Sequence, residues 1–98
     1  MYAVVNHLRL REGAAPGVVG AFAHEGLPRL RHATGLQAAH VVEAGPDHLV
    51  LVLLFDSHEF ADLVTQSLGN EWMREHVVPH LVDSTDRSAG EVVASTET

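Results

Sequence analysis

The stretch Leu49-Val50-Leu51-Val52-Leu53-Leu54-Phe55 is apolar at every position. A short run of this kind predicts a central β-strand, because apolar residues on both faces of a strand need cover on both faces. Helices packed on one face of a sheet cover only one side of this strand. A second copy of the chain is the simplest cover for the other side, so we expect a homodimer.

The segments around this strand predict a β-α-β-β-α-β order, which is the ferredoxin-like arrangement of an α+β fold. In chain order, the expected segments are a strand over 2–10, a helical stretch over 14–32, strands over 36–43 and 48–55 joined by a Gly-Pro turn, a helical stretch over 57–78 and a last strand over 87–95. We expect one domain over residues 1–95, followed by a frayed tail over 96–98.

Local signals predict how the two helical stretches begin and break. Pro28 predicts a kink, or a break into a second short helix, because proline lacks the backbone N–H that an interior helical position needs. Gly69 predicts the end of one helix and Asn70 the cap of the next. At the start of the second stretch, either Asp56 or Ser57 can act as the N-cap.

Composition excludes several functional classes. The 98 residues include six arginines, no lysine and 13 acidic residues, so the formal net charge is −7. This charge argues against general binding to nucleic acid or to anionic membranes. Cysteine is absent, which removes disulfides and thiolate chemistry, and no apolar run is long enough to span a bilayer. We therefore expect a cytoplasmic protein.

The first strand carries a lone amide, Asn6, on an otherwise apolar face. The amide can satisfy backbone groups near a strand end, or it can act as a hydrogen-bond donor in a pocket. Trp72, Phe22 and Phe60 lie on the predicted helices, where they can form the core or the wall of such a pocket. We take these three as candidate substrate-binding residues and Asn6 as a candidate catalytic residue.

His76 and His80 are four residues apart, a spacing that can place two imidazoles on one helix face as metal ligands. Pro79 interrupts that spacing, because the residue before a proline disfavours the helical conformation. We therefore predict no metal site. No glycine-rich phosphate loop and no signature for flavin or nicotinamide is present, so we predict no cofactor.

Four features together resemble the antibiotic biosynthesis monooxygenase family of dimeric α+β barrels. They are Asn6 on the first strand, Gly35 before the second strand, Phe55-Asp56-Ser57 at the end of the third strand, and an aromatic-x-x-x-His pattern from Trp72 to His76. The resemblance covers roughly residues 2–94. It implies a homodimer in which the last strand, around Val92 and Val93, reaches the partner. It does not imply one activity, since a single scaffold hosts many chemistries.

The haem-degrading branch of this family matches the chain at two positions. Its strand asparagine corresponds to Asn6 and its haem-ligating histidine to His76, whereas its helical tryptophan is replaced here by Val64. The resemblance therefore implies haem binding or haem degradation as an alternative function, with His76 as the axial ligand.

The leading hypothesis is a small monooxygenase that oxidises an aromatic or polyketide-like ligand without a cofactor. Deprotonated phenols and hydroquinones react with oxygen directly, so the protein needs to bind the substrate, remove a proton and stabilise the anion. Asn6 is the candidate anion stabiliser and His76 the candidate base. The alternative from another class is a dimer that binds a ligand or regulates a partner without catalysis.

Overall fold

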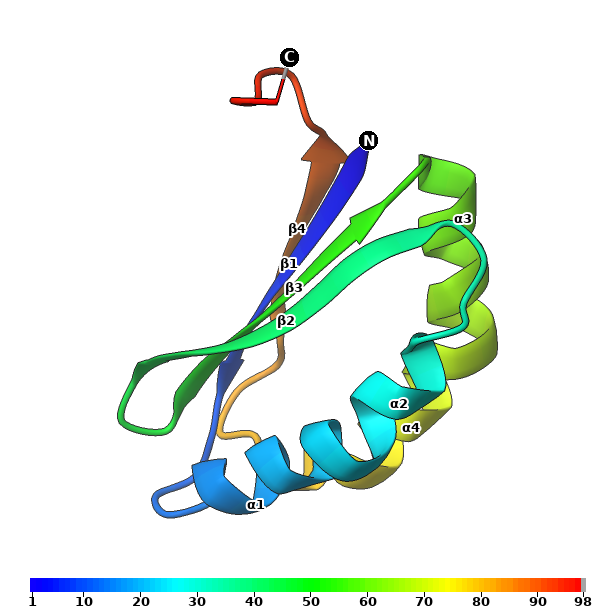
Figure 1. Ribbon diagram of the computed structural model, residues 1–98. Coiled ribbons are helices and arrows are strands. Elements are labelled where there is room, and N and C mark those ends of the chain that lie inside the picture. Colours follow the sequence, from blue (N-terminus) through cyan, green and yellow to red (C-terminus); the bar gives the residue numbers. More distant parts are fainter. Residues whose placement is uncertain (98) are drawn as a thin grey trace.

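The computed structural model describes residues 1–97 and has the predicted ferredoxin-like α+β fold (Figure 1). Its antiparallel sheet has four strands in the order β2-β3-β1-β4. The elements are β1 (Tyr2–Arg9), α1 (Ala15–Ala21), η1 (Phe22–Gly26), α2 (Leu27–Leu30), β2 (Leu36–Gly45), β3 (His48–Phe55), α3 (His58–Val64), η2 (Thr65–Gly69), α4 (Asn70–His76), η3 (Val78–His80) and β4 (Asp86–Glu91).

β3 lies inside the sheet, between β2 and β1, as the apolar run predicts. Its side chains alternate between the two faces, so every second residue is buried. The helices all lie on one face of the sheet (Figure 1), and this face holds the core. The buried core residues are Val4, Leu8, Leu10, Ala15, Val18, Phe22, Leu49, Leu51, Leu53, Phe55, Ala61, Val64, Trp72 and Val77.

No helix covers the opposite face of the sheet within residues 1–97 (Figure 1). Val50, Val52 and Leu54 of β3 are half-buried there, and Val42 of β2 is 47% exposed. At one end of this face, Nδ1 of His7 lies 3.0 Å from Nε2 of His48. The part of the uncovered face that β1 and β3 form is therefore mainly apolar, with a hydrogen-bonded histidine pair at its end.

Each of the two helical stretches contains a wide π-helical turn, η1 and η2. In η1 the Leu27 N–H donates to the carbonyl oxygen of Phe22, five residues earlier. The wide turn comes directly before Pro28, which lies in the first turn of α2, where its missing N–H costs little. The predicted disturbance at Pro28 is therefore a π-turn between two α-helical pieces.

The prediction that Gly69 ends a helix was wrong. The Asn70 N–H donates to the carbonyl oxygen of Thr65, and both Gly69 and Asn70 keep right-handed helical dihedral angles. The helical path therefore runs from α3 through η2 into α4. Asn70 is a helical residue and not a cap, and its side chain is free for another role.

Ser57, and not Asp56, caps α3. The hydroxyl of Ser57 accepts a hydrogen bond from the Phe60 N–H at 3.4 Å. The Asp56 carboxylate instead accepts a hydrogen bond from the Gln37 side chain. At the other end of the stretch, α4 ends at His76, and Pro79 lies in the short 3₁₀ helix η3, so the predicted stop near Pro79 is confirmed.

The last strand is shorter than the predicted 87–95. Glu91 pairs with Tyr2, where β1 begins, and only the Val92 N–H continues the ladder by donating to the Met1 carbonyl oxygen. Val93 is 93% exposed. In the predicted tail over 96–98, Thr96 and Glu97 form a turn, and Thr98 lies outside the described residues.

Candidate functional site

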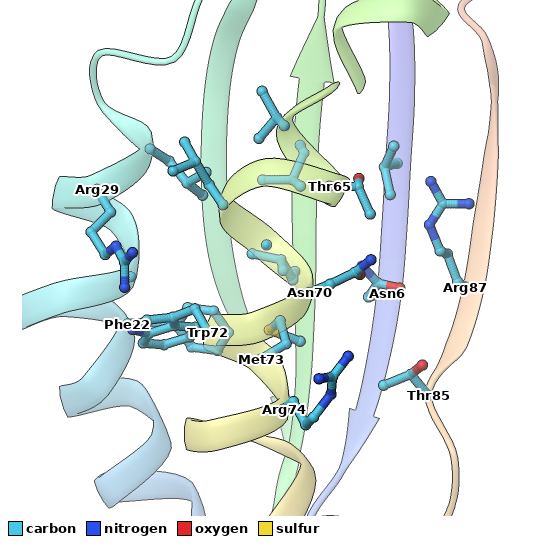
Figure 2. Close-up of a pocket in the computed structure, with 18 of the residues that line it drawn as sticks. Asn6, Phe22, Arg29, Thr65, Asn70, Trp72, Met73, Arg74, Thr85 and Arg87 are labelled. Atoms are coloured by element: carbon cyan, nitrogen blue, oxygen red, sulfur yellow. The ribbon is translucent and has the colours of Figure 1, made fainter. Parts of the chain in front are cut away.

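A cavity of about 430 Å³ lies between the helices and the sheet (Figure 2). Most of its wall is apolar, and the polar residues converge on it from β1, α2, η2, α4, β4 and the segment before β4. The apolar lining residues are Val4, Phe22, Leu30, Leu51, Leu53, Val64, Leu68, Trp72, Met73 and Val78. The polar lining residues are Asn6, Arg29, Thr65, Asn70, Arg74, Thr85 and Arg87. An apolar pocket with a few converging polar groups is typical of a site for a small organic ligand.

Trp72 forms one wall of the cavity and is 4% exposed. Its ring packs at 5.0 Å from the ring of Phe22, at an angle of 47°. A β-carbon at Gly26 would lie 2.8 Å from the indole, so glycine is needed for the helix to approach Trp72 this closely. Two of the three predicted aromatic residues, Phe22 and Trp72, therefore line the cavity.

The two π-turns lie at the cavity. Phe22 and Gly26 of η1 line it, as do Thr65, Leu68 and Gly69 of η2. A π-turn widens the helix locally and is often found at a functional site, because it turns side chains away from their α-helical direction. The two wide turns therefore shape the space between the helices and the sheet.

Asn6 lies on the face of β1 that the helices cover, and its half-buried side chain lines the cavity (Figure 2). Within residues 1–97 the Asn6 amide makes no hydrogen bond. The interpretation that this amide satisfies nearby backbone groups is therefore not supported. The amide donor and acceptor remain available to a ligand.

His76 does not line the cavity. Its ring stacks on Trp72 at 4.8 Å, and its Nε2 lies 3.5 Å from the Glu25 carboxylate and 3.8 Å from that of Glu75. The imidazole therefore lies on the side of the indole that faces away from the cavity, next to the carboxylates of Glu25 and Glu75.

Phe60 does not line the cavity either. It packs against Gly35, where a β-carbon would lie 2.2 Å from its Cγ atom. The site residues that the sequence did not reveal are Arg74, Arg87 and Asn70. An exposed arginine on a strand or helix carries no periodic signal, and the Gly69-Asn70 pair resembles a helix stop.

The Trp72 indole N–H is buried and has no hydrogen-bond partner among residues 1–97. An unpaired buried donor costs about 1–3 kcal/mol, so it is uncommon in a well-packed interior. This unpaired donor belongs to the side chain that forms one wall of the cavity and stacks on His76.

The residues present do not fit a haem held by His76. An axial ligand must point its nitrogen at the iron, whereas the His76 ring lies flat against Trp72 outside the cavity. Among the described residues, no group of three or more His, Asp or Glu side chains is arranged to hold a metal ion. His80 belongs to the 3₁₀ helix η3 and not to α4, which ends at His76.

The fold is that of solved structures named as antibiotic biosynthesis monooxygenases. One such structure superposes with a TM-score of 0.80 and 14% identity, covering 96% of this chain and 100% of the other. A candidate antibiotic biosynthesis monooxygenase from Nitrosomonas europaea gives a TM-score of 0.83 and 11% identity, covering 96% of this chain and 100% of the other. The haem degrader MhuD from Mycobacterium tuberculosis, with two haems bound in its active site, superposes with a TM-score of 0.75 and 16% identity. The superposition covers 98% of this chain and 99% of the other.

Sequence comparison adds nothing to this structural likeness. No protein-family model matches the chain, and no curated protein matches it. The likeness therefore confirms the predicted fold, while activity has to be argued from the cavity. In the described part of the chain, no helix has the length and apolar character needed to cross a membrane.

Proposed function

We propose that this chain is a small monooxygenase-like protein that binds an aromatic or polyketide-like ligand in the cavity and oxidises it with oxygen, without a cofactor. The observation that carries the proposal is the side-chain amide of Asn6, which makes no hydrogen bond within residues 1–97 and lines a mainly apolar cavity. The fold it shares with antibiotic biosynthesis monooxygenase structures is in keeping with this proposal.

The proposed reaction needs no external reductant. A hydroquinone and O₂ give a hydroxyquinone and water, so the substrate supplies all the electrons and one oxygen atom enters the ring. The difficult step is formation of the substrate anion, which then transfers an electron to oxygen. The Asn6 amide donates a hydrogen bond to the anionic oxygen, and the apolar wall strengthens that bond by excluding water.

The role of base that the sequence suggests for His76 receives no support from its position, because the ring is separated from the cavity by Trp72. We propose instead that His76 positions the indole by stacking on it. A role through Trp72 predicts that His76→Ala weakens ligand binding without changing how the rate depends on pH.

Oxygen consumption with a panel of hydroquinones tests the proposed activity. The wild type is expected to consume oxygen faster than the uncatalysed reaction, and Asn6→Ala to lose about 10²-fold or more of the rate, as is usual when a donor to an oxyanion is removed. Gln66→Ala, which removes an exposed side-chain amide outside the cavity lining, is the matched control. If ligands bind but none is turned over, the non-catalytic alternative holds. A Soret shift on adding haem that His76→Ala abolishes would favour the haem alternative.

We also propose that the chain forms a homodimer through the uncovered face of its sheet. Ala3, Val5, Val50, Val52 and Leu54 are half-buried on that face, next to the more exposed Val42. Large contiguous apolar patches are rare on soluble monomers, and a two-fold contact would cover the same patch on both copies. Sedimentation equilibrium at micromolar concentration tests this: a well-folded monomer would contradict it.

A further inference from the structure

We infer that the cavity takes up phenols as phenolate anions, and that Arg74 and Arg87 supply the positive charge that favours this form. The inference rests on the proposed function, since it names the ionised state of the substrate in the same cavity. In this mechanism, a positively charged environment favours loss of the phenol proton, and no basic side chain is needed.

The first support is the uneven distribution of charge. The chain has six arginines and 13 acidic residues. Three of the arginines, Arg29, Arg74 and Arg87, line this cavity, whereas among residues 1–97 no aspartate or glutamate lines it. Half of the arginines of this acidic protein therefore line one mainly apolar cavity.

The second support is that two of these arginines have no counter-ion. Arg29 faces Glu25 at 3.8 Å, with both side chains half exposed, so part of its charge is balanced. Within the described chain, Arg74 and Arg87 make no salt bridge and no hydrogen bond through their side chains. Figure 2 shows the two on the same side of the cavity as Asn6.

The register of the sheet explains how Arg87 reaches this position. Arg87 of β4 pairs directly with Asn6 of β1, and directly paired residues project from the same face of a sheet. Both side chains therefore project from the face that the helices cover. Arg74 comes from α4, so the two guanidinium groups belong to different layers of the fold.

The third support is the absence of a base. Among the described lining residues there is no histidine, carboxylate, tyrosine or other side chain that could accept a proton near neutral pH. The other polar groups at the wall, from Asn6, Asn70, Thr65 and Thr85, can all donate hydrogen bonds. Such a wall stabilises an anionic oxygen but cannot itself remove a proton.

The balance of effects favours the anion. An apolar wall raises the pKa of a bound phenol, whereas an opposite charge within about 6 Å lowers it by about 1–3 units. The two unpaired guanidinium groups and the hydrogen-bond donors of the wall lower the pKa of the bound phenol. The bound phenol then loses its proton to water, and Asn6 and the arginines hold the resulting anion.

The test uses 4-nitrophenol, whose phenolate is yellow, and 4-nitroanisole, which has a similar shape but cannot ionise. With saturating wild-type protein we expect the pKa of 4-nitrophenol to fall by about one unit. We also expect 4-nitroanisole to bind at least tenfold more weakly at neutral pH. Arg74→Gln and Arg87→Gln should each reduce the pKa shift, and the double variant should remove most of it.

Arg11→Gln is the matched control, since Arg11 is exposed and does not line the cavity. Added salt should also reduce the shift, because it screens exposed charges. If 4-nitrophenol binds with an unchanged pKa and 4-nitroanisole binds equally well, the inference is overturned while the ligand-binding cavity stands. If neither probe binds, the proposed function fails and the inference fails with it.

Discussion

Gly35 has a φ of +83°, and a β-carbon there would lie 2.2 Å from Cγ of Phe60. Both the left-handed conformation and the close approach require glycine. We expect Gly35→Ala to lower the free energy of unfolding by about 2–4 kcal/mol, from backbone strain and overpacking together. Urea denaturation measures the change.

Gly20→Ala is the control for this substitution, because Gly20 is helical and a β-carbon there meets nothing within 4 Å. Its stability should rise by about 0.5–1 kcal/mol. Equal effects of the two substitutions would contradict the role given to Gly35.

At the residue level, the sequence reveals Asn6 but not the arginines. A single amide in an apolar, alternating row stands out, and Asn6 lines the cavity, while its role as a hydrogen-bond donor there stays a prediction. Arg74 and Arg87 do not stand out, since an arginine on an exposed surface is ordinary. Their position at the cavity depends on how α4 and β4 pack in three dimensions, and the sequence pattern does not show this packing.

The start of α3 makes stability depend on acidity. Glu59 lies in the first turn, and hydrogen bonds from its own backbone N–H and then from the Ser57 hydroxyl lower the pKa of its carboxyl group below the ordinary value of 4.5. Since the folded state has the lower pKa, this stabilisation is present above pH 4.5 and is lost as the pH falls through the lowered value.

We therefore expect Glu59→Gln to be less stable than the wild type near neutral pH, and the two proteins to converge in acid. Urea titrations at several pH values measure the difference. In a Ser57→Ala background, which lacks the hydroxyl, the effect of Glu59→Gln should shrink. A difference that stays constant with pH would contradict the assignment.

At the level of elements, the central strands β1 and β3 were easier to predict than the helix interiors or the edge strand β4, which ends four residues before its predicted end. The alternating pattern of β1 and the apolar run of β3 each predict a strand and no other element. The bounds of both strands differ from the prediction by at most one residue. Gly69 and Asn70 fit both a helix stop and the inside of a wide turn. Packing against the sheet decides between these, because a continuous helical path places Trp72 in the core.

The two faces of β3 allow a test of the whole assembly. Leu53 is 8% exposed on the helix side, whereas Val52 is half-buried on the uncovered side. Leu53→Asp should lower the free energy of unfolding by several kcal/mol, because it places an unpaired charge in the core. Val52→Asp should instead dissociate the proposed dimer.

Sedimentation and urea denaturation together separate these outcomes. Val52→Asp should sediment as a folded monomer, and its stability should no longer depend on protein concentration. A wild-type stability that is already independent of concentration would count against the dimer.

At the scale of the whole molecule, the order of segments was sufficient to predict the sheet and its helix layer. An uninterrupted apolar strand in a β-α-β-β-α-β order leaves few ways to cover both faces. The size and shape of the cavity were not predictable, since they depend on two π-turns and on a glycine that approaches Trp72 closely.

The wide turn η2 also makes the length of its helix adjustable. A hydrogen bond that spans five residues instead of four encloses one residue more than an α-helical turn does, so η2 can be regarded as an α-helix with one residue inserted. Deleting the exposed Gln66 should convert the stretch into a regular helix that keeps its flanks facing the sheet. Deleting Asp62 from the regular helix α3 should instead rotate the residues between the deletion and η2 by about 100° and turn Val64 out of the core. Thermal unfolding should find the first deletion at least as stable as the wild type and the second severely destabilised, while only the wild type keeps the space that a ligand needs.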